Sequence, residues 1–206
     1  MGEAALSAAC ALRAGPTIYF VRHGETDWNA EARYQGQADI PLNDKGRMQA
    51  HRNGAVLRFL LPQIAEADFV ASPLERARES MAIVRDALGL EPDAFRIDDR
   101  LKEAHYGFWQ GTLASDLPEI DAEGLSARRR DPYRWCPPGG ESYEALMGRI
   151  VPWLAEIERD TVAVSHGGVS RVLRGNILGI ALATVPLLEV PHDRVLIMRR
   201  GSAEWL

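Results

Sequence analysis

The stretch that decides the fold of this 206-residue chain reads Thr17-Ile18-Tyr19-Phe20-Val21-Arg22-His23-Gly24. Its first five residues are β-branched, aromatic or apolar, and a short run of this kind that stops at a glycine predicts a buried strand. The same pattern returns later, where Thr161-Val162-Ala163-Val164 precedes Ser165-His166-Gly167. Both histidines therefore follow a predicted strand directly, and the glycine after each allows backbone to approach closely.

Further strand and helix patterns alternate along the chain. Apolar spacing after the N-cap Asn43 predicts a helix to about Pro62, and a second predicted helix, Leu74 to Leu88, ends at Gly89. Pro152 should kink or interrupt a later helix, because proline lacks an N–H group and clashes with the preceding turn. The other predicted elements are a strand at Asp68–Ser72, helices from about Ser142 and to about Leu178, and a hairpin of Val195–Met198 with Ala203–Leu206.

This alternation predicts an α/β fold whose mostly parallel sheet is covered on both faces. The length suits one domain, which we assign to residues 17–206, after a flexible N-terminal tail or short helix at residues 1–16. Residues 95–140 lack a clear period. We expect them to form loops and short helices over a site, and not a second domain.

The composition is that of an ordinary globular protein, with 46% hydrophobic and 26% charged residues. A net charge of -5 disfavours a nucleic-acid partner. No stretch approaches the roughly 18 apolar residues that a membrane span requires, and Glu3 stands where a signal peptide would be basic. Two cysteines, Cys10 and Cys136, have no metal-ligand spacing, so we expect a soluble, cytoplasmic protein with free thiols.

The polar residues after the predicted strands indicate a phosphate site. In open α/β sheets, ligands bind beyond the carboxyl ends of the strands, where His23 and His166 fall. The strand that ends at Ser72 brings Arg76 to the same rim, in the first turn of a helix, where anions are favoured. Arg22 adds a further cation, and like charges crowded together are unfavourable unless an anion joins them.

Each chemical role has a candidate among these residues. Neutral imidazole is a competent nucleophile near pH 7, and arginines offer forked donors to phosphoryl oxygens. The leaving oxygen needs a proton, for which Glu103 is the best-placed general acid. We expect no metal and no other cofactor, because the sequence has no HExxH, CxxC or comparable spacing and no phosphate-binding loop that ends in Gly-Lys-Ser/Thr.

Several motifs occur in a fixed order from about Thr17 to the C-terminus. They are Arg22-His23-Gly24-Glu25-Thr26, Asn29, Gln35-Gly36, Leu42 with Gly46, Ser72-Pro73-Leu74-Glu75-Arg76-Ala77, Leu101-Lys102-Glu103 with Gly107 and Gly111, Pro138-Gly139-Gly140-Glu141-Ser142, and Ser165-His166-Gly167. Together they resemble the histidine phosphatase superfamily, also called phosphoglycerate-mutase-like. The resemblance implies a three-layer α/β/α sandwich with a mostly parallel sheet.

The resemblance also assigns roles. It implies that His23 is the phosphorylated nucleophile and Glu103 the proton donor, and that Arg22, Arg76 and His166 hold the phosphoryl group. It further implies that the pocket is lined by Asn29, Gln35, Gly36 and the backbone of Gly167. Tyr106 is a further candidate for the pocket wall, and no metal is expected.

The family contains both phosphatases and cofactor-dependent mutases, and the mutases carry a longer insert before the Gly-Glu-Ser motif. Here 37 residues separate Glu103 from Glu141, which favours a phosphatase acting on a small phosphorylated metabolite. Glu103-Ala104-His105-Tyr106-Gly107, by contrast, is similar to the mutase form. A cofactor-dependent phosphoglycerate mutase is therefore the alternative, and a non-catalytic phospholigand-binding module is a second one. The identity of the ester and the oligomeric state stay open, and a homodimer is compatible with the sequence.

Overall fold

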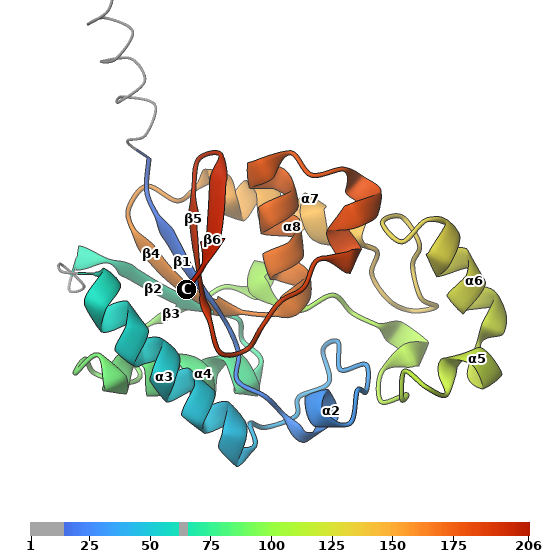
Figure 1. Cartoon of the computed structure of the whole chain (residues 1–206), viewed down its shortest axis with the longest axis horizontal. Helices are drawn as coiled ribbons and strands as arrows, with labels where there is room; N and C mark the ends of the chain where they lie inside the picture. The colour runs from blue at the N-terminus through green and yellow to red at the C-terminus, as the bar shows by residue number, and fades with distance from the viewer. Residues whose placement is uncertain (1–14, 62–65) are drawn as a thin grey trace, which may run out of the picture.

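A six-stranded sheet forms the centre of the computed structural model, which describes residues 15–61 and 66–206 (Figure 1). The strand order is β3-β2-β4-β1-β5-β6, in which the first four strands run parallel and the last two form an antiparallel hairpin. The strands are β1 (Ile18–Arg22), β2 (Asp68–Ala71), β3 (Arg96–Ile97), β4 (Thr161–Ser165), β5 (Val195–Arg199) and β6 (Ser202–Trp205). The predicted fold class, an α/β/α sandwich with a mostly parallel sheet, is confirmed.

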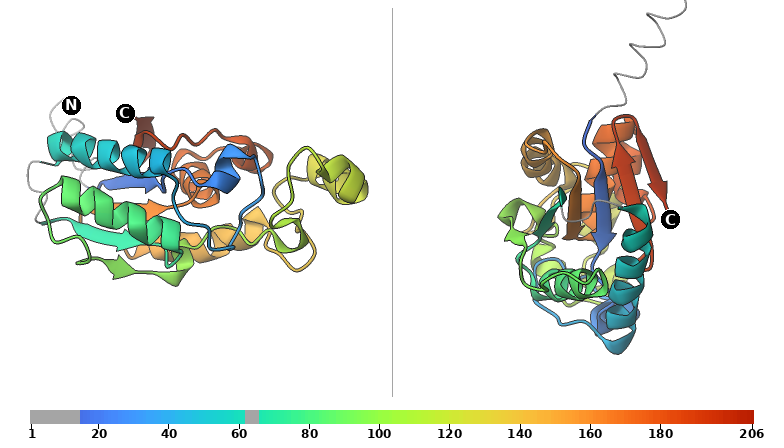
Figure 2. Two further views of the ribbon diagram at one scale, coloured as in Figure 1. Left: turned by 90° about the horizontal axis from the view of Figure 1, so that it is seen from below. Right: turned by 90° about the vertical axis from the view of Figure 1, so that its left-hand side faces the viewer.

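Helices cover both faces of this sheet (Figure 2). One face carries α3 (Asp44–Leu60) and α4 (Glu75–Ala87), and the other carries α7 (Tyr143–Ala155) and α8 (Gly167–Leu178). Successive side chains of β1 point to opposite faces, as the two-residue period of a strand requires. Tyr19 and Val21 join the core with α3 and α4, and Ile18 and Phe20 join the core with α7 and α8.

The pairing of β1 with β4 brings two distant parts of the sequence to one edge. Val21 lies opposite Val164, and Arg22 lies opposite Ser165. The backbone N–H of His23 then donates to the carbonyl oxygen of Ser165 at 2.9 Å. The two strands therefore end at the same level, and the histidine that follows each strand lies beside the other.

Local signals place most helix ends as predicted. Asn43 caps α3 by accepting from the N–H of Gly46 at 2.8 Å, and Gly179, in the left-handed conformation, follows α8. Pro152 does not interrupt α7, which continues through it to Ala155, so the predicted interruption is wrong. Pro152 and Gly148, whose carbonyl loses its helical partner, are both exposed, so water can satisfy that carbonyl.

The segment after β3 forms loops and short helices, as predicted. It contains η2 (Asp99–Leu101), η3 (Gly107–Trp109), α5 (Leu117–Ile120) and α6 (Ala122–Arg130), and α5 and α6 project beyond the sheet (Figure 1). Two short elements, α2 (Asp27–Ala30) and η4 (Leu182–Leu187), complete the chain. The sequence did not predict β3, which has two residues, or α6, which has no buried residue and therefore no apolar face to reveal it.

Two expectations concern the whole chain. Within residues 15–61 and 66–206, no helix is long and apolar enough to span a bilayer. Most of the expected N-terminal tail, residues 1–14, lies outside the described residues.

Candidate active site

The carboxyl ends of β1, β2 and β4 border a cavity of about 130 Å³. The predicted site residues that line it are Arg22, His23, Asn29, Gln35, Gly36, Arg76, Glu103, Tyr106 and Gly167. Arg33, Tyr34 and Arg171 also line the cavity, although the sequence did not single them out. His166 is the one predicted site residue that is not among the residues lining the cavity.

His23 presents one unprotonated ring nitrogen. Its Nδ1 lies 2.7 Å from the carbonyl oxygen of Gly24, and because a carbonyl only accepts, Nδ1 carries the proton. Nε2 therefore keeps its lone pair, toward which the Nε–H of Arg76 points at 3.3 Å. Burial, followed by the charge of Arg76, lowers the pKa of His23 well below its usual value. The ring is thus neutral at pH 7.

Close backbone packing holds the turn after His23. A Cβ added to Gly24 would lie 2.2 Å from the carbonyl oxygen of Gly46, in the first turn of α3. The N–H of Gly24 also donates to the hydroxyl of Ser80 on α4 at 3.0 Å. Because the helices on this face clamp the turn, Gly24 and Gly46 are both required to be glycine.

Arg76 and Arg22 bring two buried positive charges to the cavity. Arg76 is fully buried and donates to the carbonyl oxygens of Gly36 at 2.7 Å and Ala38 at 2.8 Å. Arg22 donates to Val190 O at 2.6 Å, while its buried Nε has no partner within the part of the chain that the structure describes. Burial lowers the pKa of each arginine to about 10, so both remain cationic at pH 7. These charges favour an anion in the cavity.

His166 lies beside His23 with its ring centroid 5.1 Å away. It is fully buried immediately before α8, and its Nε2 lies 2.7 Å from the hydroxyl of Ser72. Its Nδ1 is buried and finds no hydrogen-bond partner in residues 15–61 and 66–206. Burial, followed by the charges of Arg76 and Arg22, lowers the pKa of His166 well below its usual value.

Glu103 points its carboxylate at the start of α8. Both carboxylate oxygens lie 3.1 Å from the N–H of Gly168, and Oε1 also accepts from the N–H of Ala104 at 2.8 Å. A Cβ added to Gly168 would lie 2.3 Å from Oε1, so only glycine leaves room for the carboxylate.

The Pro-Gly-Gly-Glu-Ser motif supports the backbone of Glu103. Glu141 pairs with Arg149 at 2.8 and 2.9 Å, and Arg149 donates to the carbonyl oxygen of Glu103 at 3.1 Å. Gln37 donates to the same carbonyl at 2.9 Å. The acidic residue is thus held at both its side chain and its main chain.

The polar residues near the cavity mouth are partly occupied by contacts with each other. Asn29 Oδ1 accepts from the N–H and hydroxyl of Thr26 in a capping box, which leaves only its Nδ2 group for a ligand. Gln35 donates to the hydroxyl of Thr26, and its buried Oε1 has no hydrogen-bond partner among the residues described. Gly36 has φ of +55°, and a Cβ there would meet Gln110 and Tyr106.

His192 is a contact of the nucleophile candidate that the sequence analysis missed. Its Nδ1–H donates to the carbonyl oxygen of His23 at 2.7 Å, and the two ring centroids are 5.5 Å apart. Burial, and then the charge of Arg22, lowers the pKa of His192 to about 4. The available signal was its place before the predicted strand at Val195, because an antiparallel neighbour of β1 starts at the rim where β1 ends.

Arg128 belongs to a basic run, residues 128–130, for which the sequence left a solvated face and substrate contact open. Its Nη1 donates to the hydroxyl of Tyr34 at 2.6 Å, and its guanidinium lies 5.7 Å from the Trp109 ring centroid. Tyr34 in turn packs edge to face on Tyr106 at 5.1 Å. Arg128 therefore supports the aromatic wall of the cavity from outside.

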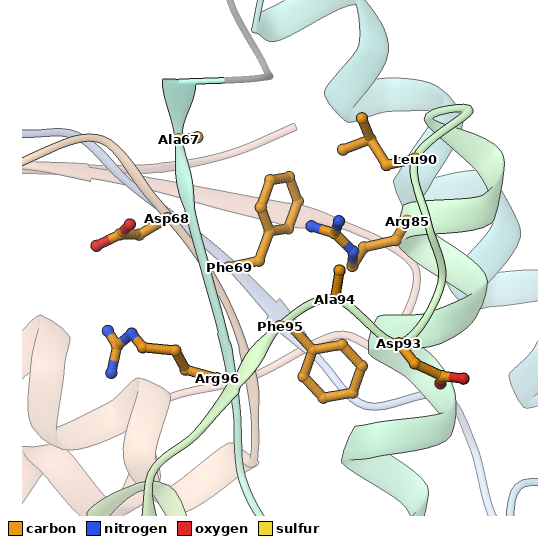
Figure 3. A pocket seen from close by; sticks show the side chains of 9 residues that line it. All are labelled: Ala67, Asp68, Phe69, Arg85, Leu90, Asp93, Ala94, Phe95 and Arg96. Atoms are coloured by element: carbon orange, nitrogen blue, oxygen red, sulfur yellow. The ribbon is translucent and has the colours of Figure 1, made fainter.

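A second, larger hollow of about 550 Å³ lies at the amino-terminal end of β2 (Figure 3). Arg85 lies over the Phe69 ring there, 4.4 Å from its centroid, and donates to Glu91 O at 2.7 Å. None of the described residues that line this hollow is a histidine. It lies at the opposite end of the strand from the histidine cluster, so we place the candidate site in the smaller cavity.

Comparisons with known proteins identify the family of the chain. The family model described as "Histidine phosphatase superfamily (branch 1)" matches residues 18–206. The chain is 35% identical to a glucosyl-3-phosphoglycerate phosphatase of Mycolicibacterium vanbaalenii, over 92% of this chain and 82% of the relative. It is 39% identical to phosphoglycerate mutase-like protein 4 of Arabidopsis thaliana, over 76% and 68%. The crystal structure of the alpha-ribazole phosphatase from Shigella flexneri superposes with a TM-score of 0.76 at 26% identity, over 92% and 94%.

Proposed function

This chain belongs to the histidine phosphatase superfamily, and from that premise we propose that it hydrolyses phosphomonoesters through a phosphoryl group carried on His23. It is an enzyme that acts as a phosphatase on small phosphorylated metabolites. One observation carries the choice of His23: its Nε2 lone pair faces the cationic cavity, while Nδ1 is held by the carbonyl of Gly24.

In the first half-reaction, Nε2 of His23 attacks phosphorus, and the P–N bond forms as the bond to the leaving oxygen breaks. Glu103 gives that oxygen its proton. In the second half-reaction, water attacks the phosphohistidine, the carboxylate of Glu103 takes a proton from the water, and the P–N bond breaks to release inorganic phosphate. Proton transfer of this kind is worth about 10²- to 10⁴-fold in rate.

Arg22 and Arg76 stabilise the charge on the transferring phosphoryl group. Backbone carbonyls hold both guanidiniums in place before substrate arrives, so little reorganisation accompanies the reaction. The ring of His166 lies beside that of His23, with the centroids 5.1 Å apart, and its Nδ1 has no hydrogen-bond partner among the described residues, which suits it to hydrogen-bond a phosphoryl oxygen. The same cavity is lined by Asn29, Gln35, Gly36, Tyr106 and the backbone of Gly167, to which we assign substrate binding.

A short exposure to ³²P-labelled ester, followed by quenching, tests the intermediate. We expect an acid-labile, alkali-stable label on the wild-type chain and none on His23→Asn. His51→Asn, which removes an exposed histidine on α3, is the matched control and should keep the label. A chain that binds the ester tightly without ever becoming labelled is a phospholigand-binding module instead.

The role of Glu103 has its own test. Glu103→Gln should slow alkyl esters such as glycerol 3-phosphate by about 10²- to 10⁴-fold. It should slow p-nitrophenyl phosphate far less, because the nitrophenolate oxygen needs little protonation. Glu119→Gln, at an exposed carboxylate on α5, is the control. Equal slowing of both esters by Glu103→Gln would remove Glu103 from the role of proton donor.

A phosphoglycerate mutase is the second candidate, favoured by the similarity to a relative named for that activity. ³¹P NMR of the chain with 3-phosphoglycerate and 2,3-bisphosphoglycerate separates the two. The phosphatase releases inorganic phosphate, whereas a mutase makes 2-phosphoglycerate without it. A cytoplasmic location is also part of the proposal, and fractionation of the source cells tests it.

A further inference from the structure

The peptide that joins His23 to Gly24 is held at both of its ends. Its carbonyl oxygen, on His23, accepts from the Nδ1–H of His192 at 2.7 Å. Its N–H, on Gly24, donates at 3.0 Å to the hydroxyl of Ser80, which itself donates to the carbonyl oxygen of Arg76 at 2.7 Å. The plane of this peptide is therefore fixed by side chains from two distant parts of the chain.

The orientation of this peptide reaches the nucleophilic nitrogen through Gly24. The next carbonyl, that of Gly24, accepts from Nδ1 of the His23 ring at 2.7 Å. A rotation of the His23–Gly24 peptide would move this carbonyl, and the ring would then lose the contact that holds its protonated nitrogen and limits its rotation. Because Nε2 is the attacking atom in the proposed reaction, its direction depends on what holds the peptide.

His192 is itself held by α3. Its carbonyl oxygen accepts from Nδ2 of Asn53, a fully buried residue of that helix, at 3.0 Å. Asp193, the next residue, pairs with Arg52 of the same helix at 3.5 Å. The ring of His192 packs edge to face on that of His23, with the centroids 5.5 Å apart. The helix thus fixes the backbone from which the imidazole donates.

We propose that His192 is a positioning residue, whose Nδ1–H holds the His23–Gly24 peptide in the orientation that aims Nε2 of His23 at phosphorus. The proposal rests on the phosphatase reaction proposed above. His192 lies outside the cavity lining, so it acts through His23 and not by contact with substrate. Its loss should slow phosphorylation of the enzyme and leave phosphate binding unchanged, because Arg22 and Arg76 keep their own backbone partners.

Substitutions of His192 test the donor on the full-length chain. His192→Leu removes it and should slow phosphohistidine formation from p-nitrophenyl phosphate by about 10- to 100-fold in rapid-quench single turnovers, the cost of misplacing a reacting group by about 1 Å. His192→Asn should keep the rate within about threefold, because its amide nitrogen is as many bonds from Cα as Nδ1 and also donates. Titration with inorganic phosphate should give a Kd within about twofold of the wild-type value for both variants.

Arg52→Met is the matched control. It breaks the pair with Asp193, one residue beyond His192 in the same loop, and leaves the contacts of His23 intact. It should keep the wild-type rate. If the leucine variant does not fold, His192→Ala takes its place, because alanine removes the same donor without adding a bulky apolar group.

Amide hydrogen exchange separates a positioning role from a general loss of structure. In the ligand-free His192→Leu chain, the Gly24 amide should exchange about 10-fold faster than in the wild-type chain, because its peptide has lost one of two hydrogen bonds. The amides of β1, Ile18 to Arg22, should change by less. A general loss of stability would instead accelerate all of these amides equally.

The outcomes separate the proposal from the reaction on which it rests. If the wild-type chain forms no phosphohistidine, the proposed function fails, while the exchange of the Gly24 amide still shows whether His192 holds the peptide. If the label forms, three results would show that His192 does not position His23 and would leave the phosphatase reaction standing. These are an unchanged rate in folded His192→Leu, a rate loss shared by His192→Asn or Arg52→Met, and equal acceleration of the Gly24 and β1 amides.

Discussion

His23 and His166 hold the same place on two adjacent strands, yet they contact the cavity differently. Each follows the last residue of a buried strand and precedes a glycine, and their rings lie 5.1 Å apart. His23 lines the cavity and directs Nε2 toward Arg76, whereas His166 directs Nε2 to the hydroxyl of Ser72 and is not among the lining residues. The shared motif therefore sets the position of the two rings, while the contacts around each ring determine its chemistry.

The contacts differ because the chain continues differently after each histidine. After His23 it turns into a loop clamped by Gly46 and Ser80, and a backbone carbonyl fixes the protonated nitrogen. After His166 the chain enters α8 at once, so its ring is packed between that helix and Ser72. A carbonyl fixes the tautomer of His23, but a hydroxyl both donates and accepts and leaves that of His166 open.

Of the changes at the two histidines, replacement of the nucleophile should lower the activity most. His23→Asn is expected to lower kcat/KM by at least about 10⁴-fold, because no covalent intermediate remains. Steady-state hydrolysis of p-nitrophenyl phosphate, together with the phosphoenzyme label, measures this. A variant that keeps the label would mean that another residue carries the phosphoryl group.

The same substitution at His166 should lower the activity less. His166→Asn is expected to lower kcat/KM by about 10²- to 10³-fold, as for one donor to a developing oxyanion, while the label still forms on His23. Rapid-quench measurement of label formation shows it. If His166→Asn abolished the label and His23→Asn did not, the two roles assigned to these histidines would be exchanged.

Both histidines are buried and neutral, so the free energy of unfolding should depend on pH in the acid range. The folded chain holds the pKa of each below its usual value, so between pH 6.5 and 5 the unfolded chain binds more protons than the folded chain. Stability is therefore greatest above pH 6.5 and falls as the pH drops, by at most about 2 kcal/mol over this range for each buried neutral histidine.

Urea unfolding of the ligand-free chain at pH 7.0 and 5.0 measures this loss. His23→Asn and His166→Asn should each show a smaller loss than the wild-type chain, because each lacks one titrating ring. An equal loss in all three chains would show that neither histidine is held neutral by the fold.

The smallest effect concerns the partner of His166. Ser72→Ala removes the hydroxyl at 2.7 Å and should lower kcat/KM by about 3- to 10-fold, the usual worth of one neutral hydrogen bond. Ser170→Ala is the control, because the buried hydroxyl of Ser170 has no hydrogen-bond partner in the described part of the chain. If the two variants behaved alike, the contact with Ser72 would not orient His166.

Local chemistry in the sequence determined the elements and most of the candidate site. Strand runs that stop at His-Gly, the caps Asn43 and Ser142, and the glycine after α8 act within a few residues, so they predict element bounds directly. Because ligands lie at the carboxyl ends of parallel strands, the order of the elements along the chain is enough to group His23, His166 and Arg76. The assignment of Glu103 as proton donor rested on its place in the chain and on the family resemblance.

Only the tertiary structure decided which histidine faces the cavity and what surrounds it. His192 reaches the carbonyl of His23 across 169 positions of sequence, and Arg22 reaches Val190 across 168. Arg171 lines the cavity because α8 starts where β1 and β4 end side by side. No local period encodes such contacts, since they arise from the register of strands that are distant in the chain and from the packing of the helices that follow them.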